Sequence, residues 1–590
     1  MFRRLRPRFV GAAALLLTGL AVPAFTQFPG FSPGNLVVSR SVYTGTASTV
    51  TVGQPLPPNC PAGNAGCTNA IANGTYPGVW ANNGPDGSFG VTSPIFLDHM
   101  TTGGVLLNTL AVDPTQLVTS FSSKSEIALN LSTDGTAITF MGYVSTPNQL
   151  DVSNSGTPGV VDPTNPVGLS VYRGIAQVNA GGFLQVTENN AYSGNNGRAA
   201  ILANGTYYMV GNSNNGTGTP ANVVAAAGAQ GTIPSTLPEA SQAPGAPTIL
   251  GSFDVTQINP LTGKAYNTKA DKAGKDNNFR GLTVFNNTLY VTKGSGSNGI
   301  DTVYQIGNAG SLPTLAGNAP ITVLPGFNVV SAKTATAGPN PFGIWFANAN
   351  TLYVADEGDG TPADAATSPF AGLEKWSLVS GVWHLDYVLQ NGLNLGQQYG
   401  VPNYPANLNP ATDGLRNITG RVNEDGTVTI WGITSTVSAN GDQGADPNQL
   451  VMITDVLANT SAAGAAGEQF TTLRTAQYGE VLRGVSFTPG TVAPAAPPSM
   501  PVTSSGLIYN RRTATFNGTV TVTNNTSSTV TGPLAVSITN LTAGVTLNSA
   551  NPVPVLASGA TLNPGQSASG TVSFSDPTNV VINFTPVVVP

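Results

Sequence analysis

A strand–turn–strand pattern recurs five times between residues 126 and 435 and constrains this chain more than any other feature. Each copy joins two short runs rich in Val, Ile, Tyr, Phe and Thr, which favour β-strands. The turns between them carry Asp-Gly, Asn-Gly or neighbouring Asn residues, which tolerate the positive φ of tight hairpins. The copies are EIALNLS–TAITFMGYV around Asp134-Gly135, RAAIL–TYYMVG around Asn204-Gly205, RGLTVF–TLYVTKG around Asn286-Asn287, FGIWFA–TLYVADEG around Asn348 and Asn350, and RNITGRV–TVTIWGITS around Asp425-Gly426.

A sixth copy, RGVSFTPG, starts at Arg483 and is broken off by Pro489-Gly490. Conversely, three strand-like runs near the start, at 35–43, 95–100 and 104–112, have no leading copy. Pairing Leu36–Tyr43 with Val485–Phe487 would complete both sets and close the repeats into a ring, which leaves few exposed sheet edges. The sequence therefore predicts an all-β protein: a six- or seven-bladed β-propeller over residues 25–490, followed by a small β-sandwich.

Composition agrees with this fold class. Hydrophobic residues make up 40% of the 590-residue chain, so there is enough apolar material for several cores. Charged residues are only 8%, whereas helical bundles and coiled coils need many more. The 70 glycines and 45 prolines are typical of many short strands joined by turns.

The N-terminus has the features of a secretory signal over residues 1–24. Four arginines precede an apolar run, Val10–Val22, that is too short to span a bilayer, and Val22-Pro23-Ala24 offers a cleavage site. Removing this leader leaves about ten excess negative charges, which argues against nucleic acid as a partner. We expect a secreted chain without a transmembrane segment, located outside the cell, at its surface or in the periplasm.

Residues 491–505 are rich in proline and uncharged, and we interpret them as a semi-rigid linker. The segment 506–590 then alternates Thr/Val strands with Asn, Gly and Pro turns, which predicts a small β-sandwich. Its runs YNRRTATFNGTVTVTNN, GPLAVSITNLTAGVTL and NPGQSASGTVSFSDP resemble the immunoglobulin- or fibronectin-like modules that end many secreted bacterial proteins. The resemblance implies an accessory role as a spacer or attachment unit.

The preceding residues also resemble a known group. NLVVSRSVY, RGLTVFNNTLYVTKGSG, YVADEG followed by GLEKWSL, and LRGVSFTPG are similar to an uncharacterised family of secreted bacterial β-propeller proteins, and more loosely to NHL and lactonase-like propellers. The resemblance implies fold and export and assigns no chemistry.

The two cysteines, Cys60 and Cys67, lie in the run CPAGNAGC. A chain exported to an oxidising compartment is expected to join them in a local disulfide. The alternative, a free or metal-bound pair, lacks the further ligands that a zinc site needs.

Residues suited to catalysis are scarce. The only histidines are His99 and His384, which we expect to be surface residues of outer strands. No GxSxG nucleophile motif is present, and GSGSNG (294–299), which formally matches GxGxxG, is followed by a strand-like run and is predicted to be a turn.

Acidic turns are candidates for a metal site. Asp356, Glu357 and Asp359 place three carboxylates within four residues after a strand, and hard oxygen ligands on a turn suit calcium. Asp442 and Asp446 form a second acidic turn. The alternative in both cases is a solvated turn, and no other cofactor is expected.

Four of the arginines outside the leader stand at the start of a repeat's first strand: Arg198, Arg280, Arg416 and Arg483. In a ring these positions are equivalent and would gather at one level. One interpretation is blade-to-blade ion pairs, with Glu188, Asp356 or Glu126 as partners. The other is an anion-binding mouth, also lined by Glu188, because arginine matches carboxylate and phosphate. Small residues after three of these arginines (Ala199, Gly281 and Gly484) predict close approach of neighbouring backbones near the axis.

Three functions remain open. The preferred one is a secreted, non-enzymatic binding protein of the cell envelope or extracellular matrix, with the propeller as binding platform for a polysaccharide or another envelope polymer. The alternatives are a metal-assisted, lactonase-like hydrolase and a purely structural surface component.

Overall fold

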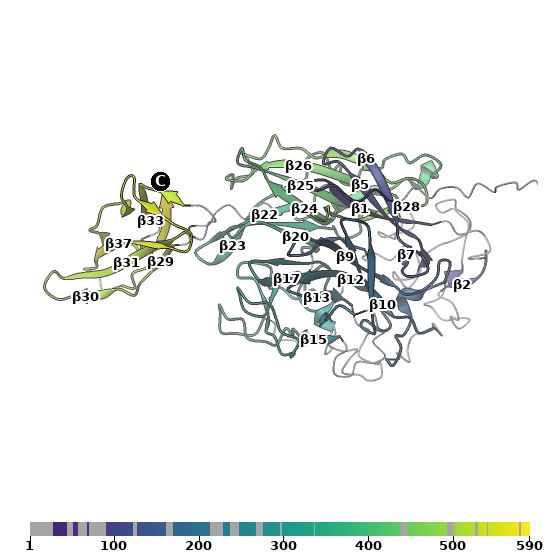
Figure 1. Ribbon diagram of the computed structural model, residues 1–590, viewed down its shortest axis with the longest axis horizontal. Helices are drawn as coiled ribbons and strands as arrows, with labels where there is room; N and C mark the ends of the chain where they lie inside the picture. Colours follow the sequence, from purple (N-terminus) through teal and green to yellow (C-terminus); the bar gives the residue numbers. More distant parts are fainter. Residues whose placement is uncertain are drawn as a thin grey trace, which may run out of the picture.

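The computed structural model describes residues 28–43, 51–56, 68–69, 90–121, 127–160, 169–212, 228–235, 247–266, 275–294, 298–335, 337–437, 446–491, 500, 502–524, 529–539, 541–577 and 580–589. Strands dominate these segments, and the fold is all-β and propeller-like (Figure 1). The predicted leader and Cys60 and Cys67 lie outside the described residues. Strands β2 (Pro55–Leu56) and β3 (Thr68–Asn69), which flank the cysteine segment, pair with each other. No helix among the described residues has the length and apolar character that crossing a membrane requires.

Six four-stranded antiparallel sheets follow one another in the described part of residues 36–487. Five of them are continuous in sequence. They comprise β8 (Asn130–Leu131), β9 (Ala137–Tyr143), β10 (Arg173–Asn179) and β11 (Leu184–Asn189); β12 (Gly197–Ala203), β13 (Thr206–Gly211), β14 (Ala229–Thr232) and β15 (Thr248–Gly251); β16 (Leu282–Phe285), β17 (Thr288–Lys293), β18 (Thr302–Ile306) and β19 (Ile321–Val323); β20 (Pro341–Asn348), β21 (Thr351–Asp356), β22 (Gly372–Val379) and β23 (Val382–Leu389); and β24 (Ala411–Val422), β25 (Thr427–Val437), β26 (Gln449–Val456) and β27 (Thr471–Thr475).

The five predicted hairpins are confirmed as the first two strands of these sheets. Four of the five turns have the positive φ that the sequence signals: Asn286 and Asn287, for example, adopt φ of 46° and 53°, and Gly426 adopts 82°. The turn at 348–350 is formed without a positive φ. Positive φ at both central residues matches the hairpin turn to the right-handed twist of the strands.

The sixth sheet, here called the closing sheet, combines both ends of this region. It orders β28 (Glu480–Phe487), β1 (Leu36–Val42), β5 (Ile95–Met100) and β6 (Leu106–Ala111). Strands β1 and β28 are antiparallel, with Leu36 opposite Phe487 and Val38 opposite Val485. The predicted pairing of the first strand with the interrupted last repeat is thus confirmed.

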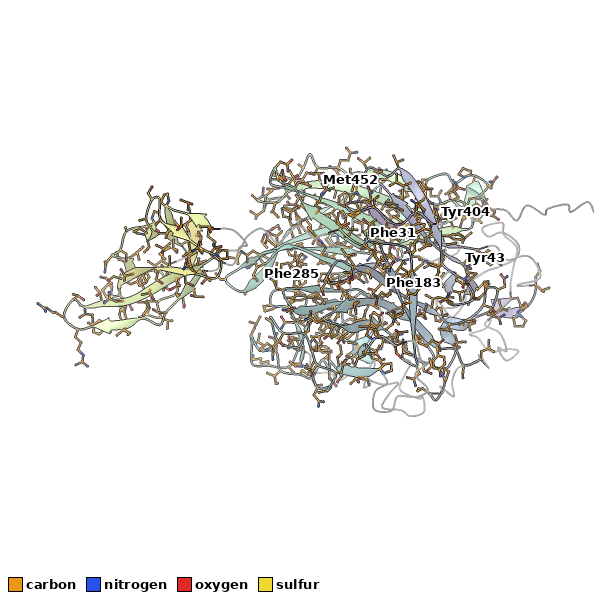
Figure 2. The ribbon with its side chains drawn as sticks, viewed as in Figure 1. Phe31, Tyr43, Phe183, Phe285, Tyr404 and Met452 are labelled. Carbon is orange, nitrogen blue, oxygen red and sulfur yellow. The ribbon has the colours of Figure 1, made fainter. Side chains whose placement is uncertain are left out.

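The sheets are joined in a closed cycle through their first strands. Strand β28 packs on β8, β8 on β12, β12 on β16, β16 on β20, β20 on β24, and β24 on β28. Apolar side chains pack between neighbouring sheets, among them Phe285, which Figure 2 labels. Phe285, for example, stacks on Phe346 of the next sheet with ring centroids 4.7 Å apart. The body is therefore held by apolar contacts that repeat from sheet to sheet.

Two larger sheets and the two-stranded pair β32 (Val530–Thr531) and β36 (Thr561–Leu562) follow residue 500. The order β29 (Val502–Ser504), β31 (Thr515–Thr523), β37 (Ser567–Ser575) and β34 (Thr546–Leu547) forms one sheet, with β30 (Ile508–Asn510) beside β31. The order β35 (Val553–Leu556), β33 (Leu534–Thr539) and β38 (Thr585–Val589) forms the other. Val520 and Val572 of the first and Val536 of the second belong to one hydrophobic cluster, so this C-terminal module has its own core.

Candidate functional site

The four repeated arginines lie at the inner strands, as their spacing predicts, but their side chains are buried. Arg198, Arg416 and Arg483 are in β12, β24 and β28, and Arg280 lies two residues before β16. Their exposed fractions are between 3% and 6%. Burial at this level requires polar partners, since a stranded guanidinium would lose its hydration without compensation.

Glu357 supplies the partner for two of them. Its carboxylate Oε1 lies 3.3 Å from Nη2 of Arg280, and its Oε2 accepts a hydrogen bond of 3.1 Å from Nε of Arg416. Both guanidinium groups also lie over the ring of Phe342, at 5.8 and 5.9 Å from its centroid. Glu357 follows β21, so one carboxylate ties together three consecutive sheets.

The other two arginines contact oxygen atoms of neighbouring segments. Arg198 donates through Nη1 to the Asn278 side chain and, at 3.0 Å, to the Phe279 carbonyl, linking its sheet to the next. Arg483 donates to Ser41 and to the Ser120 carbonyl, each at 3.4 Å. These contacts and the burial fit the interpretation of the arginines as ties between sheets rather than as an open anion-binding mouth.

Close backbone approach beside the arginines is confirmed at two glycines. A Cβ at Gly281 would lie 2.0 Å from the Phe342 carbonyl oxygen, and one at Gly484 would lie 2.5 Å from the Leu129 nitrogen. The position equivalent to these in the β20 repeat is also a glycine, Gly343, where a Cβ would lie 2.3 Å from the Arg416 carbonyl oxygen. The inner strands therefore touch backbone to backbone.

The acidic residues that the sequence singled out as arginine partners or as a second acidic turn lie in different environments. Glu188 lies half-buried on β11, the outermost strand of its sheet, where burial raises its pKa, and none of the ion pairs found among the described residues involves it. Glu126 and Asp442 lie outside the described residues. Asp446 is not a solvated turn residue: it is buried and accepts a hydrogen bond of 2.7 Å from Tyr404.

The proposed calcium ligands Asp356, Glu357 and Asp359 do not converge. Asp356 is buried and accepts hydrogen bonds from the backbone nitrogens of Asn340 and Gly358, whereas Asp359 accepts one from Thr361 in an exposed turn. Glu357 is engaged by its two arginines. Among the described residues no group of three His, Cys, Asp or Glu side chains is placed to hold a metal. Successive side chains alternate in direction at the end of a strand, so residues adjacent in sequence need not point to one place.

The two histidines differ in exposure. His384 is exposed on the outer strand β23, as expected. The expectation for His99 is wrong: it is buried on β5, where its ring contacts Asn108 at 3.2 Å and Ser32 at 3.1 Å. Residues 295–297 of the glycine-rich run 294–299 lie outside the described residues, and the element that follows the run is the strand β18, as predicted, and not a helix.

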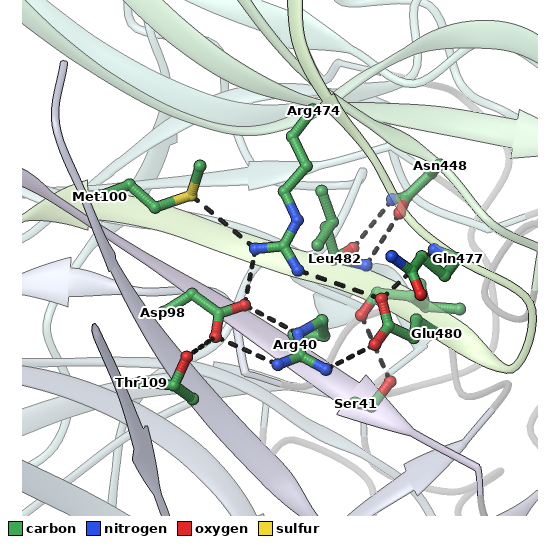
Figure 3. A network of polar contacts seen from close by, with 11 residues as sticks. Arg40, Ser41, Asp98, Met100, Thr109, Asn448, Arg474, Gln477, Glu480 and Leu482 are labelled. Carbon is green, nitrogen blue, oxygen red and sulfur yellow. Dashed lines mark hydrogen bonds and ion pairs between the residues drawn. The ribbon is translucent and has the colours of Figure 1, made fainter. Parts of the chain in front are cut away.

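One charged network was not found from the sequence. Asp98 on β5 binds Arg40 of β1 and Arg474 of β27, each at 2.7 Å, and Arg40 also binds Glu480 of β28 at 2.6 Å (Figure 3). Burial opposes ionisation of Asp98, but the hydrogen bond and charge of Arg40 and the charge of Arg474 hold its pKa below the usual value. In a chain with so few charges, the available signal was that three of these residues lie on strands of the closing sheet and the fourth, Arg474, on the last strand of the sheet before it.

A cavity of about 390 Å³ lies between the β16–β19 and β20–β23 sheets. Most of its lining is apolar: Phe327, Val330, Pro339, Pro341, Phe370 and Trp376. Phe327 stacks on Trp376 with ring centroids 3.9 Å apart. Its volume and its few polar groups match the usual character of small-molecule sites.

Two buried polar groups face this cavity. Glu374 on β22 accepts a 2.8 Å hydrogen bond from the Trp376 indole through Oε2, while its Oε1 has no hydrogen-bond partner among the described residues. The hydroxyl of Thr302 on β18 likewise has none there. Burial, and then the charge of Asp356, raise the pKa of Glu374 well above its usual value. The sequence signal was slight: one acidic residue beside a tryptophan in GLEKWSL.

Comparisons with known proteins give no family. No protein-family model and no curated protein matches the chain. The crystal structure of the N-terminal domain of Nup159 matches with a TM-score of 0.27 and 6% identity over 78% of this chain and 98% of that one. A chain of an S. cerevisiae complex of Dbp5 with Nup159 and Gle1 matches with a TM-score of 0.28 and 8% identity, over 78% of this chain and 96% of that one. Likenesses this weak carry no argument about function.

Proposed function

We propose that residues 25–490 form a six-bladed β-propeller and that residues 506–590 form an immunoglobulin- or fibronectin-like sandwich, with 491–505 as the linker and 1–24 as a removed leader. The closed cycle of six four-stranded sheets supports the blade number. The two sheets that share a separate hydrophobic cluster support the sandwich.

The function best supported is binding without turnover, by a secreted protein of the cell envelope or extracellular matrix. The propeller holds the ligand, a polysaccharide being the preferred class, and the C-terminal module serves as spacer or attachment unit. The observation that carries this proposal is the aromatic-lined cavity between the β16–β19 and β20–β23 sheets. Its described lining offers stacking surface and hydrogen-bonding groups, and includes neither histidine.

The test is a binding screen of the full mature chain against purified neutral and acidic polysaccharides, with release of reducing ends and hydrolysis of ester and lactone substrates followed in parallel. We expect saturable retention of at least one polysaccharide and no turnover. Turnover of any ester or lactone without polysaccharide binding would overturn the proposal.

A matched pair of variants ties binding to the cavity. Val330 lines the cavity and is 50% exposed, so Val330→Trp fills the opening without disturbing a core. Val329 is its neighbour, is 40% exposed and is not part of the lining. We expect Val330→Trp to abolish retention and Val329→Trp to preserve it.

A further inference from the structure

The cavity has a polar wall and an aromatic wall, built by one strand and its neighbour. Glu374 and Trp376 are two residues apart on β22 and therefore project to the same face of the sheet. Phe327 stacks on one face of the indole, so a ligand can meet only the parts of these two rings that are turned away from each other, and Thr302 of β18 brings a hydroxyl from the adjacent sheet. Glu374 is 2% exposed and Thr302 1% exposed, so both groups are removed from bulk water.

Four buried cations of the β16–β19, β20–β23 and β24–β27 sheets are each bound to another carboxylate. Lys375 points to the opposite face of β22 and pairs with Asp455 at 2.8 Å. Lys293 pairs with Asp301 at 2.5 Å. Arg280 and Arg416 share Glu357. The charged neighbour that acts on Glu374 is the carboxyl of Asp356, which repels a negative charge. Burial and the lack of a Lys or Arg in the described lining therefore favour Glu374 as a carboxylic acid, with one O–H to donate.

The chemistry of these walls limits what can enter. An anion would face the Glu374 carboxyl group, and the described lining holds no Lys or Arg to balance it. Burying an unpaired charge is costly. A group that accepts a hydrogen bond from the acid and donates one to Thr302 satisfies both buried atoms, which otherwise remain unpaired. A flat or weakly puckered ring fills the space against the indole and phenyl faces.

We infer that this cavity selects an uncharged cyclic ligand, such as a neutral sugar residue, that sets its ring against Trp376 and Phe327 and its polar edge against Glu374 and Thr302. The inference rests on the proposed binding function and narrows it: the recognised unit is neutral, and an acidic polymer is bound only through neutral residues.

The charge rule is tested with three probes that share one ring: benzamide, benzoate and benzylammonium. Their binding to the full mature chain is measured by saturation-transfer NMR and tryptophan fluorescence at pH 7. We expect benzamide to bind about tenfold more tightly than either ion, the difference that one buried hydrogen bond or charge mismatch makes. Tighter binding of benzylammonium would show that Glu374 is ionised. Equal affinity for all three probes would show that the cavity does not discriminate ligands by their charge. Either result would overturn the inference.

Variants test the two polar atoms. Glu374→Gln keeps a donor and an acceptor without charge, and should leave benzamide affinity within about threefold, whereas Glu374→Leu should lower it about tenfold. Thr302→Val removes only the hydroxyl and should also weaken binding. If Glu374→Leu does not fold, Val330→Trp still decides whether benzamide occupies this cavity. Benzamide binding that all of these variants leave unchanged would overturn the inference.

Polysaccharide screening separates the two proposals. Benzamide preference without binding of any polysaccharide would leave the charge rule standing and remove the glycan assignment. Polysaccharide binding that Glu374→Leu and Val330→Trp leave intact would place the binding function elsewhere and refute the cavity's role.

Discussion

Glu357 shows how single residues hold this ring together. It follows a strand of one sheet and its two carboxylate oxygens bind arginines of the sheets before and after it. Such a buried group adds little net stability over an apolar core, but removing one partner leaves the other charge without compensation. The repeated arginines are therefore expected to be sensitive to truncation one at a time.

Arg416→Ala should lower the free energy of unfolding by about 3–5 kcal/mol, because Glu357 would lose one of its two cations in the interior. Urea denaturation followed by tryptophan fluorescence measures this. Lys264→Ala, in an exposed turn of the same body, is the control and should change stability by less than about 0.5 kcal/mol. An unchanged midpoint for Arg416→Ala would show that the ion pair is not structural.

Gly281→Ala tests the backbone contact between inner strands. The added Cβ would lie 2.0 Å from the Phe342 carbonyl oxygen, so a strand must shift, at a cost of about 1–3 kcal/mol or more. Gly400→Ala is the matched control, because a Cβ there meets no atom within 4 Å. Equal melting temperatures for the two variants would contradict close packing at the axis.

At the scale of elements, the β20–β23 sheet concentrates buried carboxyl groups. Burial raises the pKa of Asp356 to about 7, and Glu374 on the neighbouring strand is also raised. A carboxyl with a raised folded pKa holds a proton that the unfolded chain has already released, so the stability it contributes is lost as pH rises.

Between about pH 4, the ordinary value for an aspartate, and about pH 7, the free energy of unfolding should therefore decline, by at most about 1.4 kcal/mol per pH unit for each such proton. Urea midpoints at pH 5, 6, 7 and 8 measure the slope. Glu374→Gln, whose side chain cannot ionise, should make the decline of the urea midpoint with pH less steep. A midpoint that rises from pH 5 to 7 would show that these groups are ionised in the folded protein.

Hairpins could be predicted from the sequence because their information is local: turn residues with positive φ lie between two strand-forming runs. The inner arginines and their glycines could be placed because repetition makes equivalent positions visible. The cavity could not be predicted from the sequence, because Thr302 and Glu374 come from different sheets and no sequence pattern links them. The three acidic residues Asp356, Glu357 and Asp359 do not converge for a related reason: adjacency in sequence does not fix the directions of their side chains.

At the scale of the whole molecule, the closing sheet makes the ring depend on residues more than 400 positions apart. Val485 on β28 pairs with Val38, and its backbone nitrogen donates to Asn417 of β24 at 2.6 Å. The same residue thus serves the closing sheet and the sheet before it.

Val485→Pro removes this donor and interrupts β28, so it should open the cycle and expose every sheet to hydrogen exchange. Exchange mapped by mass spectrometry should show lost protection in all six sheets and retained protection in β31 and β37 of the C-terminal module, whose core is separate. Lost protection confined to β1 and β28 would contradict closure as the source of the ring's cooperativity. Val52→Pro, at an exposed position outside the strands, is the control.

The direction in which the two ends of the chain leave the closing sheet has a mechanical consequence. The ladder starts where Thr488 donates to the Asn35 carbonyl and Leu36 faces Phe487, and it ends where Val42 faces Glu480. Both chain ends therefore leave from the same end of the ladder, and tension between them loads its rungs in succession instead of shearing all of them together. The β1–β28 ladder should therefore open one residue pair at a time and at low force. The ion pair between Arg40 and Glu480, near the far end of the ladder, should then resist further opening. A protein tethered through its C-terminal module and pulled from its N-terminal side would thus release its first and last strands before any other blade gave way.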